Sequence, residues 1–207
     1  MTKLTIALPK GRLAQKALEL IEQCGITLSD ALDDRKLIIY DKNNEYRFLY
    51  VKPADVPTYV ERGTADIGIA GKDTIMEEGK DIYELLDLKI GKCRLCVAGK
   101  SPEIIKNARV LRVATKYPNI ARQYFESKFI FPDIIELKGS VELAPITDLS
   151  DVILDIVESG ATLRSNGLHV LEEVADISAR LIANKVSFKT KYDIINPILK
   201  SLERLVG

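Results

Sequence analysis

Residues 152–163 combine a strand, a turn and a helix start with residue types that bind phosphate. Residues 152–157 are almost continuously apolar and predict a buried strand, and Glu158, Ser159 and Gly160 follow it before a predicted helix. Backbone N–H groups of such a loop can surround a phosphate, and the start of a helix favours negative charge. The pattern therefore predicts an anion site in this loop.

Side chains of the same loop could add polar contacts. The hydroxyls of Ser159 and Thr162 can donate hydrogen bonds to phosphate oxygens, and the carboxylates of Asp155 and Glu158 can accept them from ribose hydroxyls. The alternative is a plain strand–turn–helix in which Thr162 caps the helix and binds no ligand. The spacing alone leaves both interpretations open.

Two other turns carry positive charge beside the end of a predicted strand. Lys10, Gly11 and Arg12 follow the first strand, and Lys72 follows a strand that ends in Gly71. Ligands of parallel α/β sheets bind at the carboxyl ends of the strands, so these cations could hold anions. The alternative is an ordinary glycine turn with solvated basic residues in each case.

Composition excludes several kinds of chemistry. The chain of 207 residues contains a single histidine, His169, which excludes a cluster of His metal ligands. Cys93 and Cys96 form a lone CxxC whose side chains would point to opposite faces of a strand, so a zinc or redox site is disfavoured. An enzyme of this composition must work with Arg, Lys, carboxylates and backbone donors.

The balance of charge and hydropathy limits the partners and the location. Lys plus Arg and Asp plus Glu each number 30, which argues against a large nucleic-acid footprint. No apolar run approaches the roughly 20 residues of a membrane helix, and the N-terminus does not resemble an export signal. We therefore expect a cytoplasmic protein with reduced thiols and no membrane contact.

Short apolar runs alternate with helical patterns and predict an α/β protein. We expect helices from about residue 13 to just before Gly25, at 56–62, from about Thr74, at 118–128 and at 191–206. The last of these has an apolar stripe typical of a helix packed on a core. The expected strands cover residues 3–8, 37–40, 47–51, 66–70, 95–98, 110–114, 134–137, 152–157, 169–175 and 178–183.

So many strands would make one sheet unusually wide, so we expect two α/β lobes around a central cleft. The first lobe is predicted to be discontinuous, comprising residues 1–90 and 180–207, to which the last helix returns. The second lobe is predicted to cover residues 91–179 and to carry the phosphate loop.

The loop at residues 155–162 resembles the loop with which phosphoribosyltransferases bind phosphoribosyl pyrophosphate (PRPP). Its order is acid, two apolar residues, acid, Ser or Thr, Gly, any residue, Thr. Leu154 stands where these enzymes often have the first of two adjacent acids. Glu142 could supply the missing carboxylate if the fold brings the two loops together.

Eight segments, in order along nearly the whole chain, resemble the catalytic chain of the ATP phosphoribosyltransferase family. Each is weakly specific alone, and the ordered set is highly specific. They are PKGRL at 9–13, DDRKL at 33–37, ADVPTYV at 54–60, GIAGKD at 68–73, LLDL at 85–88, ATKY at 114–117, GSVELAP at 139–145 and ESGATLRSNGL at 158–168.

This resemblance implies an architecture and partners. The family has a type II periplasmic-binding-protein-like fold of two α/β lobes with a discontinuous first lobe. The chain is similar to the short form, which works as a homodimer of catalytic chains with a histidyl-tRNA synthetase-like regulatory subunit, usually in a hetero-octamer. Feedback by histidine acts through that assembly.

The resemblance also implies a reaction, the first step of histidine biosynthesis (EC 2.4.2.17). This pentosyltransferase reaction joins N1 of the adenine of ATP to C1 of PRPP and releases pyrophosphate, with inversion at C1. Because negative charge grows on the departing pyrophosphate, cations near it are required. Magnesium is the expected cofactor, held mainly by pyrophosphate and water, with no protein metal cluster.

The roles implied for individual residues follow from this reaction. Arg12 and Arg35 are the catalytic candidates at the charged phosphates, because guanidinium groups bind phosphate bidentately. The remaining implied contacts fall into three groups. Lys10, Gly11 and Lys72 assist at the phosphates; Glu158, Ser159, Gly160, Ala161, Thr162 and Leu163 form the ribose 5-phosphate loop; Asp155 and Glu142 contact the ribose or magnesium-bound water.

Two alternatives remain open from the sequence. One is a non-catalytic protein that binds a small anion, and the other is a phosphoribosyltransferase for a different base.

Overall fold

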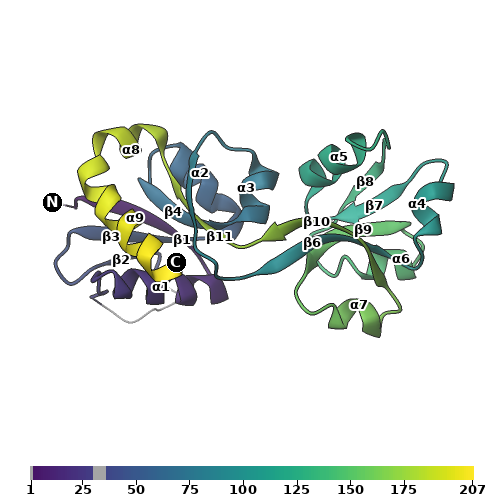
Figure 1. Cartoon of the computed structure of the whole chain (residues 1–207), viewed down its shortest axis with the longest axis horizontal. Coiled ribbons are helices and arrows are strands. Elements are labelled where there is room, and N and C mark those ends of the chain that lie inside the picture. The colour runs from purple at the N-terminus through teal and green to yellow at the C-terminus, as the bar shows by residue number, and fades with distance from the viewer. Residues whose placement is uncertain (1, 30–35) are drawn as a thin grey trace. The chain divides into compact units, whose positions relative to one another are not determined.

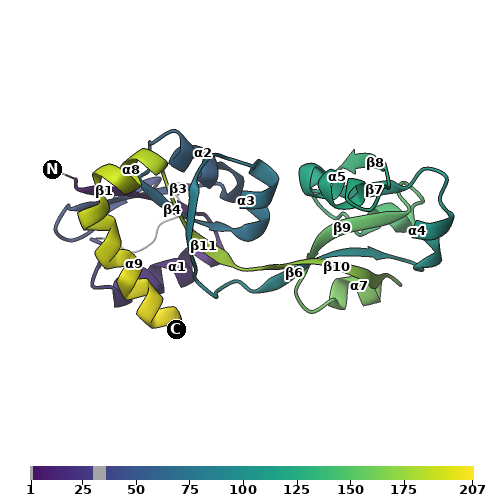
Figure 2. The same ribbon diagram turned by 45° about the horizontal axis from the view of Figure 1, so that its top comes forward.

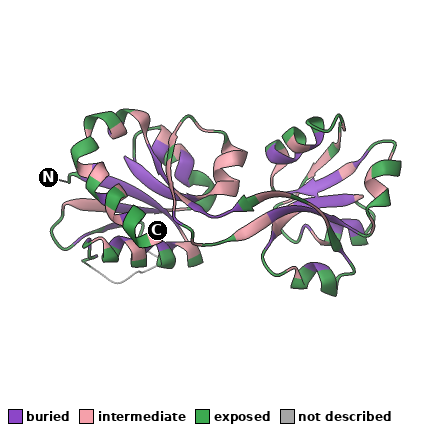
Figure 3. Ribbon diagram, viewed as in Figure 1, coloured by how far each residue is buried: buried purple, intermediate pink, exposed green. Residues whose placement is uncertain are grey.

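The computed structural model describes residues 2–29 and 36–207, which form two compact units. The first unit comprises Met1–Gly91 and Ser178–Gly207, and the second comprises Lys92–Ile177. Each unit has its own sheet and its own buried core (Figures 1 and 3). The chain is thus an α/β protein with a first unit that is discontinuous in sequence. In the described residues, no helix has the length and apolar character needed to cross a membrane.

The sheet of the first unit has six strands in the order β2-β3-β1-β4-β11-β5. Neighbouring β3, β1 and β4 are parallel, whereas β2 is antiparallel to β3 and β11 is antiparallel to both β4 and β5. The carboxyl ends of β3, β1, β4 and β5 therefore lie at one edge. Their bounds are β1 Leu4–Pro9, β2 Ile38–Tyr40, β3 Tyr46–Val51, β4 Ile67–Gly71, β5 Tyr83–Asp87 and β11 Ala179–Ala183.

Helices cover both faces of this sheet because successive strand residues point to opposite sides. Leu4, Ile6 and Leu8 of β1 pack in a core with apolar residues of α1 and α9, and Ala7 packs in a second core with Val56 of α2. Figure 2 shows α1 and α9 together on one side of the sheet. The helices are α1 Arg12–Gln23, α2 Val56–Glu61, α3 Lys72–Glu78, α8 Lys185–Thr190 and α9 Tyr192–Val206, with a short 3₁₀ turn at Pro53–Asp55.

A buried carboxylate ties the C-terminal helices to the sheet. Asp66 is 5% exposed and accepts hydrogen bonds from Thr5 N (2.8 Å), Ser187 Oγ (2.7 Å) and Lys191 Nζ (2.8 Å). A buried charge is tolerated when it is paired and hydrogen-bonded in this way. These contacts connect the start of α9 to β1 and β4 of the first unit.

The second unit has a five-stranded sheet in the order β10-β6-β9-β7-β8. β9, β7 and β8 run parallel, and β6 is antiparallel to both β9 and β10. The apolar strand β9 is thus central in a mixed sheet. The strands are β6 Cys93–Gly99, β7 Arg112–Thr115, β8 Asp133–Glu136, β9 Val152–Val157 and β10 His169–Ile177.

Both faces of this second sheet are also covered. Ile120, Ala121 and Phe125 of α5 are buried, and this helix packs on β7 and β8. On the other face, Ala144 of α6 and Leu163 of α7 join a core with strand residues. The helices are α4 Glu103–Asn107, α5 Pro118–Glu126, α6 Leu143–Ile146 and α7 Ala161–Ser165.

All ten expected strands and six expected helices, including the one expected after Gly160, have a counterpart in the structure, with shifts of a few residues at their ends. The helix expected from about Thr74 begins at Lys72, directly after β4. Five elements were not predicted, namely β5, α4, α6, α8 and the 3₁₀ turn at Pro53–Asp55. Three of them are helices of four to six residues, too short to show a helical period.

Candidate functional site

The carboxyl ends of β7, β8 and β9 lie at one edge of the second sheet, because these strands are parallel neighbours. The loops that follow them bring three sequence segments to this edge: residues 116–117, 137–142 and 158–160. Two of these loops contain the predicted phosphate and ribose residues. The topology thus places the β8–α6 loop and the β9–α7 loop on the same side of the same sheet.

The β9–α7 loop has a backbone conformation that favours glycine. Gly160 lies at φ 70° and ψ 10°, in the left-handed region, and immediately precedes α7. Ser159 Oγ accepts a hydrogen bond from Ala161 N (3.3 Å), and Arg164 Nη1 donates to the Ser159 carbonyl oxygen (3.0 Å). The loop is therefore held by its own residues, and Ala161 and Thr162 are exposed at the start of the helix.

The predicted carboxylates lie on or beside the same strand. Asp155 is half-buried in β9, opposite Cys96 of β6, and its Oδ1 accepts a hydrogen bond from Ile156 N (2.9 Å). Glu158 is exposed in the loop. Glu142, the residue before α6 on the β8–α6 loop, is half-buried. Leu163 is buried in the core that Ala144 of α6 also joins, and its packing holds the start of α7 in place.

A buried threonine orients the third loop of this edge. Thr115, at the end of β7, is completely buried; its hydroxyl donates to the Leu154 carbonyl oxygen (2.6 Å) and accepts from Tyr117 N (2.8 Å). The hydroxyl thus connects β7, β9 and the turn into α5. In the sequence, Thr115 stands out only as part of the ATKY segment at 114–117. A polar residue at the end of a buried strand was the available signal.

The first unit presents positive charge at the carboxyl edge of its sheet. Lys10 follows β1, and its backbone N–H donates to the Val51 carbonyl oxygen at the end of β3 (2.8 Å). Gly11, at φ 99°, lets the chain turn into α1, whose first residue is the exposed Arg12. The predicted Lys10–Arg12 turn is therefore positioned by the strand β1 and the helix α1.

Two more lysines extend this edge. Lys72 directly follows β4, its N–H donates to the Ser178 carbonyl oxygen (3.0 Å), and its Nζ donates to Glu84 Oε2 (2.6 Å). Lys52 directly follows β3 and is exposed. Because β3, β1 and β4 are consecutive in the sheet, Lys52, Lys10 and Lys72 form a row. Lys52 was not predicted, because only the strand order brings it to this edge.

Arg35, the second predicted catalytic residue, lies outside the described residues, as do residues 33–34 of the same motif. Among the described residues, no three His, Cys, Asp or Glu side chains group as metal ligands. Asp155, Glu158 and Glu142 supply carboxylate oxygens at the carboxyl edge of the second sheet, which can accept hydrogen bonds from the water shell of a Mg²⁺ held by phosphate oxygens. Burial raises the pKa of the Cys96 thiol, which favours the unreactive protonated form.

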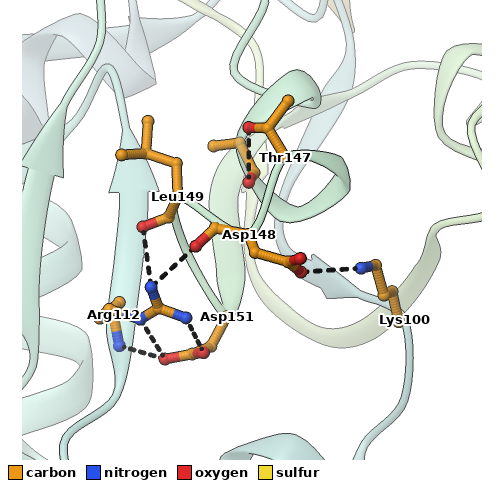
Figure 4. A network of polar contacts seen from close by, with 7 residues as sticks. Lys100, Arg112, Thr147, Asp148, Leu149 and Asp151 are labelled. Atoms are coloured by element: carbon orange, nitrogen blue, oxygen red, sulfur yellow. Dashed lines mark hydrogen bonds and ion pairs between the residues drawn. The ribbon is translucent and has the colours of Figure 1, made fainter.

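The opposite edge of the second sheet is stabilised by an arginine clamp (Figure 4). Asp151, just before β9, accepts hydrogen bonds from the Arg112 backbone N (2.8 Å), Nε (3.2 Å) and Nη2 (2.7 Å), and Arg112 Nη1 donates to the Asp148 carbonyl oxygen (2.8 Å). The Arg112 hydrogen bonds hold the pKa of the Asp151 carboxyl below its ordinary value. This clamp fixes the start of β7 and β9, at the ends far from the phosphate loop.

Comparison with known proteins relates this chain to one family. The family model described as HisG, ATP phosphoribosyltransferase, matches residues 52–204. The ATP phosphoribosyltransferase of Lachnoclostridium phytofermentans is 52% identical and covers 100% of this chain and 98% of its own length. That of Brachyspira hyodysenteriae is 54% identical, covering 98% of this chain and 100% of the relative.

Solved structures agree with the fold. A chain of the ATP phosphoribosyl transferase (HisG:HisZ) complex from Thermotoga maritima has a TM-score of 0.86 and 36% identity, covering 98% of this chain and 97% of that chain. The BvgS VFT2 domain of Bordetella pertussis has a TM-score of 0.58 at 8% identity, which shows the fold alone. The two-unit architecture is that of type II periplasmic-binding-protein-like domains. The chain belongs to the ATP phosphoribosyltransferase family, pentosyltransferases that catalyse the first step of histidine biosynthesis.

Proposed function

We propose that the carboxyl edges of the two sheets have different roles in the ATP phosphoribosyltransferase reaction. In this reaction a bond forms between N1 of ATP adenine and C1 of PRPP, and the bond from C1 to the pyrophosphate oxygen breaks. The first unit, predicted as residues 1–90 with 180–207, acts on the charged phosphates. The second, predicted as residues 91–179, holds the phosphoribosyl group. Adenine N1 is already a free nucleophile, so the chain need not supply a general base.

The ribose 5-phosphate is assigned to the β9–α7 loop. Backbone N–H groups at Gly160 and Ala161 and the hydroxyls of Ser159 and Thr162 are neutral donors that can surround a phosphate. The exposed start of α7 and the absence of a side chain at Gly160 support this role, because both allow a ligand to approach the backbone closely. Leu163 contributes by packing behind the loop.

The departing pyrophosphate is assigned to Arg12 and Arg35, with Lys10, Gly11 and Lys72 in supporting contacts. Stabilising the charge that grows on this group lowers the barrier to breaking the C1–O bond. The position of Arg12 at the start of α1, beside the row of lysines, supports the assignment. The role of Arg35 rests on the family motif alone.

Asp155, Glu158 and Glu142 are assigned to ribose hydroxyls or to magnesium-bound water. When bound, Mg²⁺ neutralises part of the charge on the pyrophosphate oxygens. The carboxylates of this chain would then orient the ribose and the water shell. Asp155 lies in β9, Glu158 in the loop after it and Glu142 in the β8–α6 loop, and their location at one sheet edge supports a shared ligand.

We further propose a regulatory partner. A similar chain occurs in a complex named HisG:HisZ, which supports a histidyl-tRNA synthetase-like regulatory subunit for this chain too. The proposal includes a homodimer of catalytic chains within a hetero-octamer, and a cytoplasmic location. Size-exclusion chromatography with light scattering, with and without the regulatory subunit, would test the stoichiometry.

The observation that carries the substrate assignment is the ESGAT loop of residues 158–162 at the carboxyl end of β9. The direct test mixes the chain, ATP, PRPP and Mg²⁺ and follows phosphoribosyl-ATP formation by ultraviolet absorbance. Product formation is expected; its absence with the regulatory subunit added would favour a protein that only binds a small anion. Competition by other bases would reveal a different acceptor.

A further inference from the structure

An ion-pair chain leads away from Lys72 within the first unit. Lys72 Nζ donates to Glu84 Oε2 (2.6 Å), and the other oxygen of the same carboxylate, Oε1, lies 3.5 Å from Arg180 Nε. Arg180 Nη2 in turn lies 3.3 Å from Asp87 Oδ2. One carboxylate, that of Glu84, is thus shared between two cations from different elements.

The two contacts of Glu84 are unequal. Its contact with Lys72 is a short hydrogen bond, whereas its distance to Arg180 Nε is too long for a good one. Arg180 Nε is a buried donor without a hydrogen-bond partner among the described residues. An unsatisfied buried donor is costly, so Arg180 would gain if Glu84 moved toward it.

The strand geometry makes such a movement local. Arg180 of β11 pairs with Asp87 of β5, and Ile182 pairs with Glu84, with a register shift between the two pairs. Because of this irregularity Arg180 contacts both carboxylates, although Glu84 and Asp87 are three residues apart in β5. The side chains of Lys72, Glu84 and Arg180 remain 30%, 29% and 21% exposed. Solvent can therefore reach the pair, and a change of side-chain torsion suffices to exchange partners.

We propose that Glu84 is a positioning residue that sets the availability of Lys72 for phosphate. This inference rests on the proposed phosphate role of Lys72. Without an anion, Glu84 holds the Lys72 ammonium beside β5. When a phosphate oxygen binds Lys72, Glu84 closes on Arg180 Nε, which satisfies the buried donor and offsets the loss of the lysine contact.

Glu84 also lowers the affinity of this edge for anions, since a carboxylate beside the site repels phosphate and competes for its cation. Removal of the charge in Glu84→Gln should therefore tighten anion binding. Because the pair is partly exposed, the effect is expected to be about two- to fivefold, the range of a solvent-screened ion pair.

The test measures binding of pyrophosphate to the full chain by calorimetry at low ionic strength. Glu84→Gln is expected to bind about two- to fivefold more tightly than wild type. The matched control is Glu78→Gln, which removes one negative charge from α3 next to Lys80 and not next to Lys72. The control should bind like wild type, and the gain should vanish in a Lys72→Gln background. Thermal unfolding of each variant confirms that it is folded.

The outcomes separate this inference from the function on which it rests. If wild type does not bind pyrophosphate, or if Lys72→Gln leaves its affinity unchanged, the phosphate role of Lys72 is wrong and the inference falls with it. If Lys72→Gln weakens binding but Glu84→Gln behaves like Glu78→Gln, the phosphate role stands and only the role of Glu84 is wrong. A gain that persists without Lys72 also overturns the positioning role.

Discussion

The carboxyl edges of the two sheets differ in the groups they offer to a ligand. The edge of the first unit carries full positive charges on long side chains, Lys52, Lys10, Arg12 and Lys72, while the loop of the second carries backbone N–H groups and hydroxyls around Gly160. Both edges arise in the same way, from parallel strands that end together. The topology therefore provides the location, and the residues after each strand decide which chemistry occurs there.

This difference fits the different demands of the two phosphate groups under the proposed roles. The 5-phosphate keeps its charge throughout the reaction, and a fixed loop of neutral donors suits it. The pyrophosphate gains negative charge as its bond breaks, and cations stabilise that change most. Substitutions at the charged edge should therefore lower kcat, and substitutions at the neutral loop should weaken PRPP binding.

The largest effect is expected for Arg12→Ala. Loss of a cation that stabilises the leaving group should reduce kcat about 100-fold, with a smaller change in the KM for PRPP. Steady-state kinetics at saturating ATP and PRPP would measure it. Arg62→Ala is the control, since Arg62 ends α2 and its side chain is largely exposed. Unchanged turnover in Arg12→Ala would remove Arg12 from the leaving-group role.

The contrasting change in the second unit is Thr162→Val. This substitution keeps the side-chain shape and removes the hydroxyl, and the lost hydrogen bond to a charged phosphate should weaken PRPP binding about tenfold. Calorimetry with PRPP would measure the Kd. Thr190→Val is the control, because the Thr190 hydroxyl bonds only the Val186 carbonyl oxygen in α8 among the contacts described. An equal Kd in wild type and Thr162→Val would move the 5-phosphate to another loop.

Alanine substitutions at two glycines can distinguish the role of the β9–α7 loop in binding from the effect of backbone strain. Gly160 and Gly167 flank α7 and have nearly the same positive φ, 70° and 69°. Alanine at either position should lower the free energy of unfolding by about 1 kcal/mol. A Cβ at Gly160 would lie 3.1 Å from Arg164 Nη1, whereas nothing lies within 4 Å at Gly167.

Only Gly160→Ala should therefore also weaken PRPP binding, by a few-fold. Chemical denaturation and PRPP titration of both variants would test the pair. Equal losses of affinity in the two variants would mean that strain in α7, and not the loop itself, controls the site.

Local patterns in the sequence predicted the elements that carry the loops. The apolar run of β9 followed by ESGAT, and the PKGR turn after β1, are contiguous, so the strand–loop–helix order could be inferred without the fold. The apolar stripe of residues 191–206 likewise predicted a helix packed on a core, although it did not indicate which unit supplies that core. These features depend on residues close in sequence.

Features that depend on strand order could not be predicted. Lys52 joins the cationic edge only because β3 lies beside β1. Glu84 reaches Lys72 only because β5 lies two strands away from β4, on the other side of β11. Thr115 bonds Leu154, 39 residues away in sequence. A single sequence contains the groups but not these pairings, which tertiary packing decides.

The smallest effect is expected at the edge of the second sheet that faces away from the loop. The pKa of Asp151 is lowered by Arg112, so this carboxylate stabilises the fold above its unfolded pKa of about 3.9, and the contribution is lost as pH falls through the folded value. Asp151→Asn should reduce the free energy of unfolding at pH 7 by roughly 0.5–1 kcal/mol, since water screens the partly exposed pair.

That difference should shrink on acidification below about pH 4, where the wild-type carboxyl becomes protonated. Denaturation of both proteins at several pH values would measure it, with Asp148→Asn as the control because the Asp148 side chain is 86% exposed. PRPP affinity at pH 7 should be the same in wild type and Asp151→Asn, because the clamp holds the amino ends of β7 and β9. If Asp151→Asn lost PRPP affinity without losing stability, the two edges of this sheet would be coupled, and the β9–α7 loop would depend on the charge of Asp151.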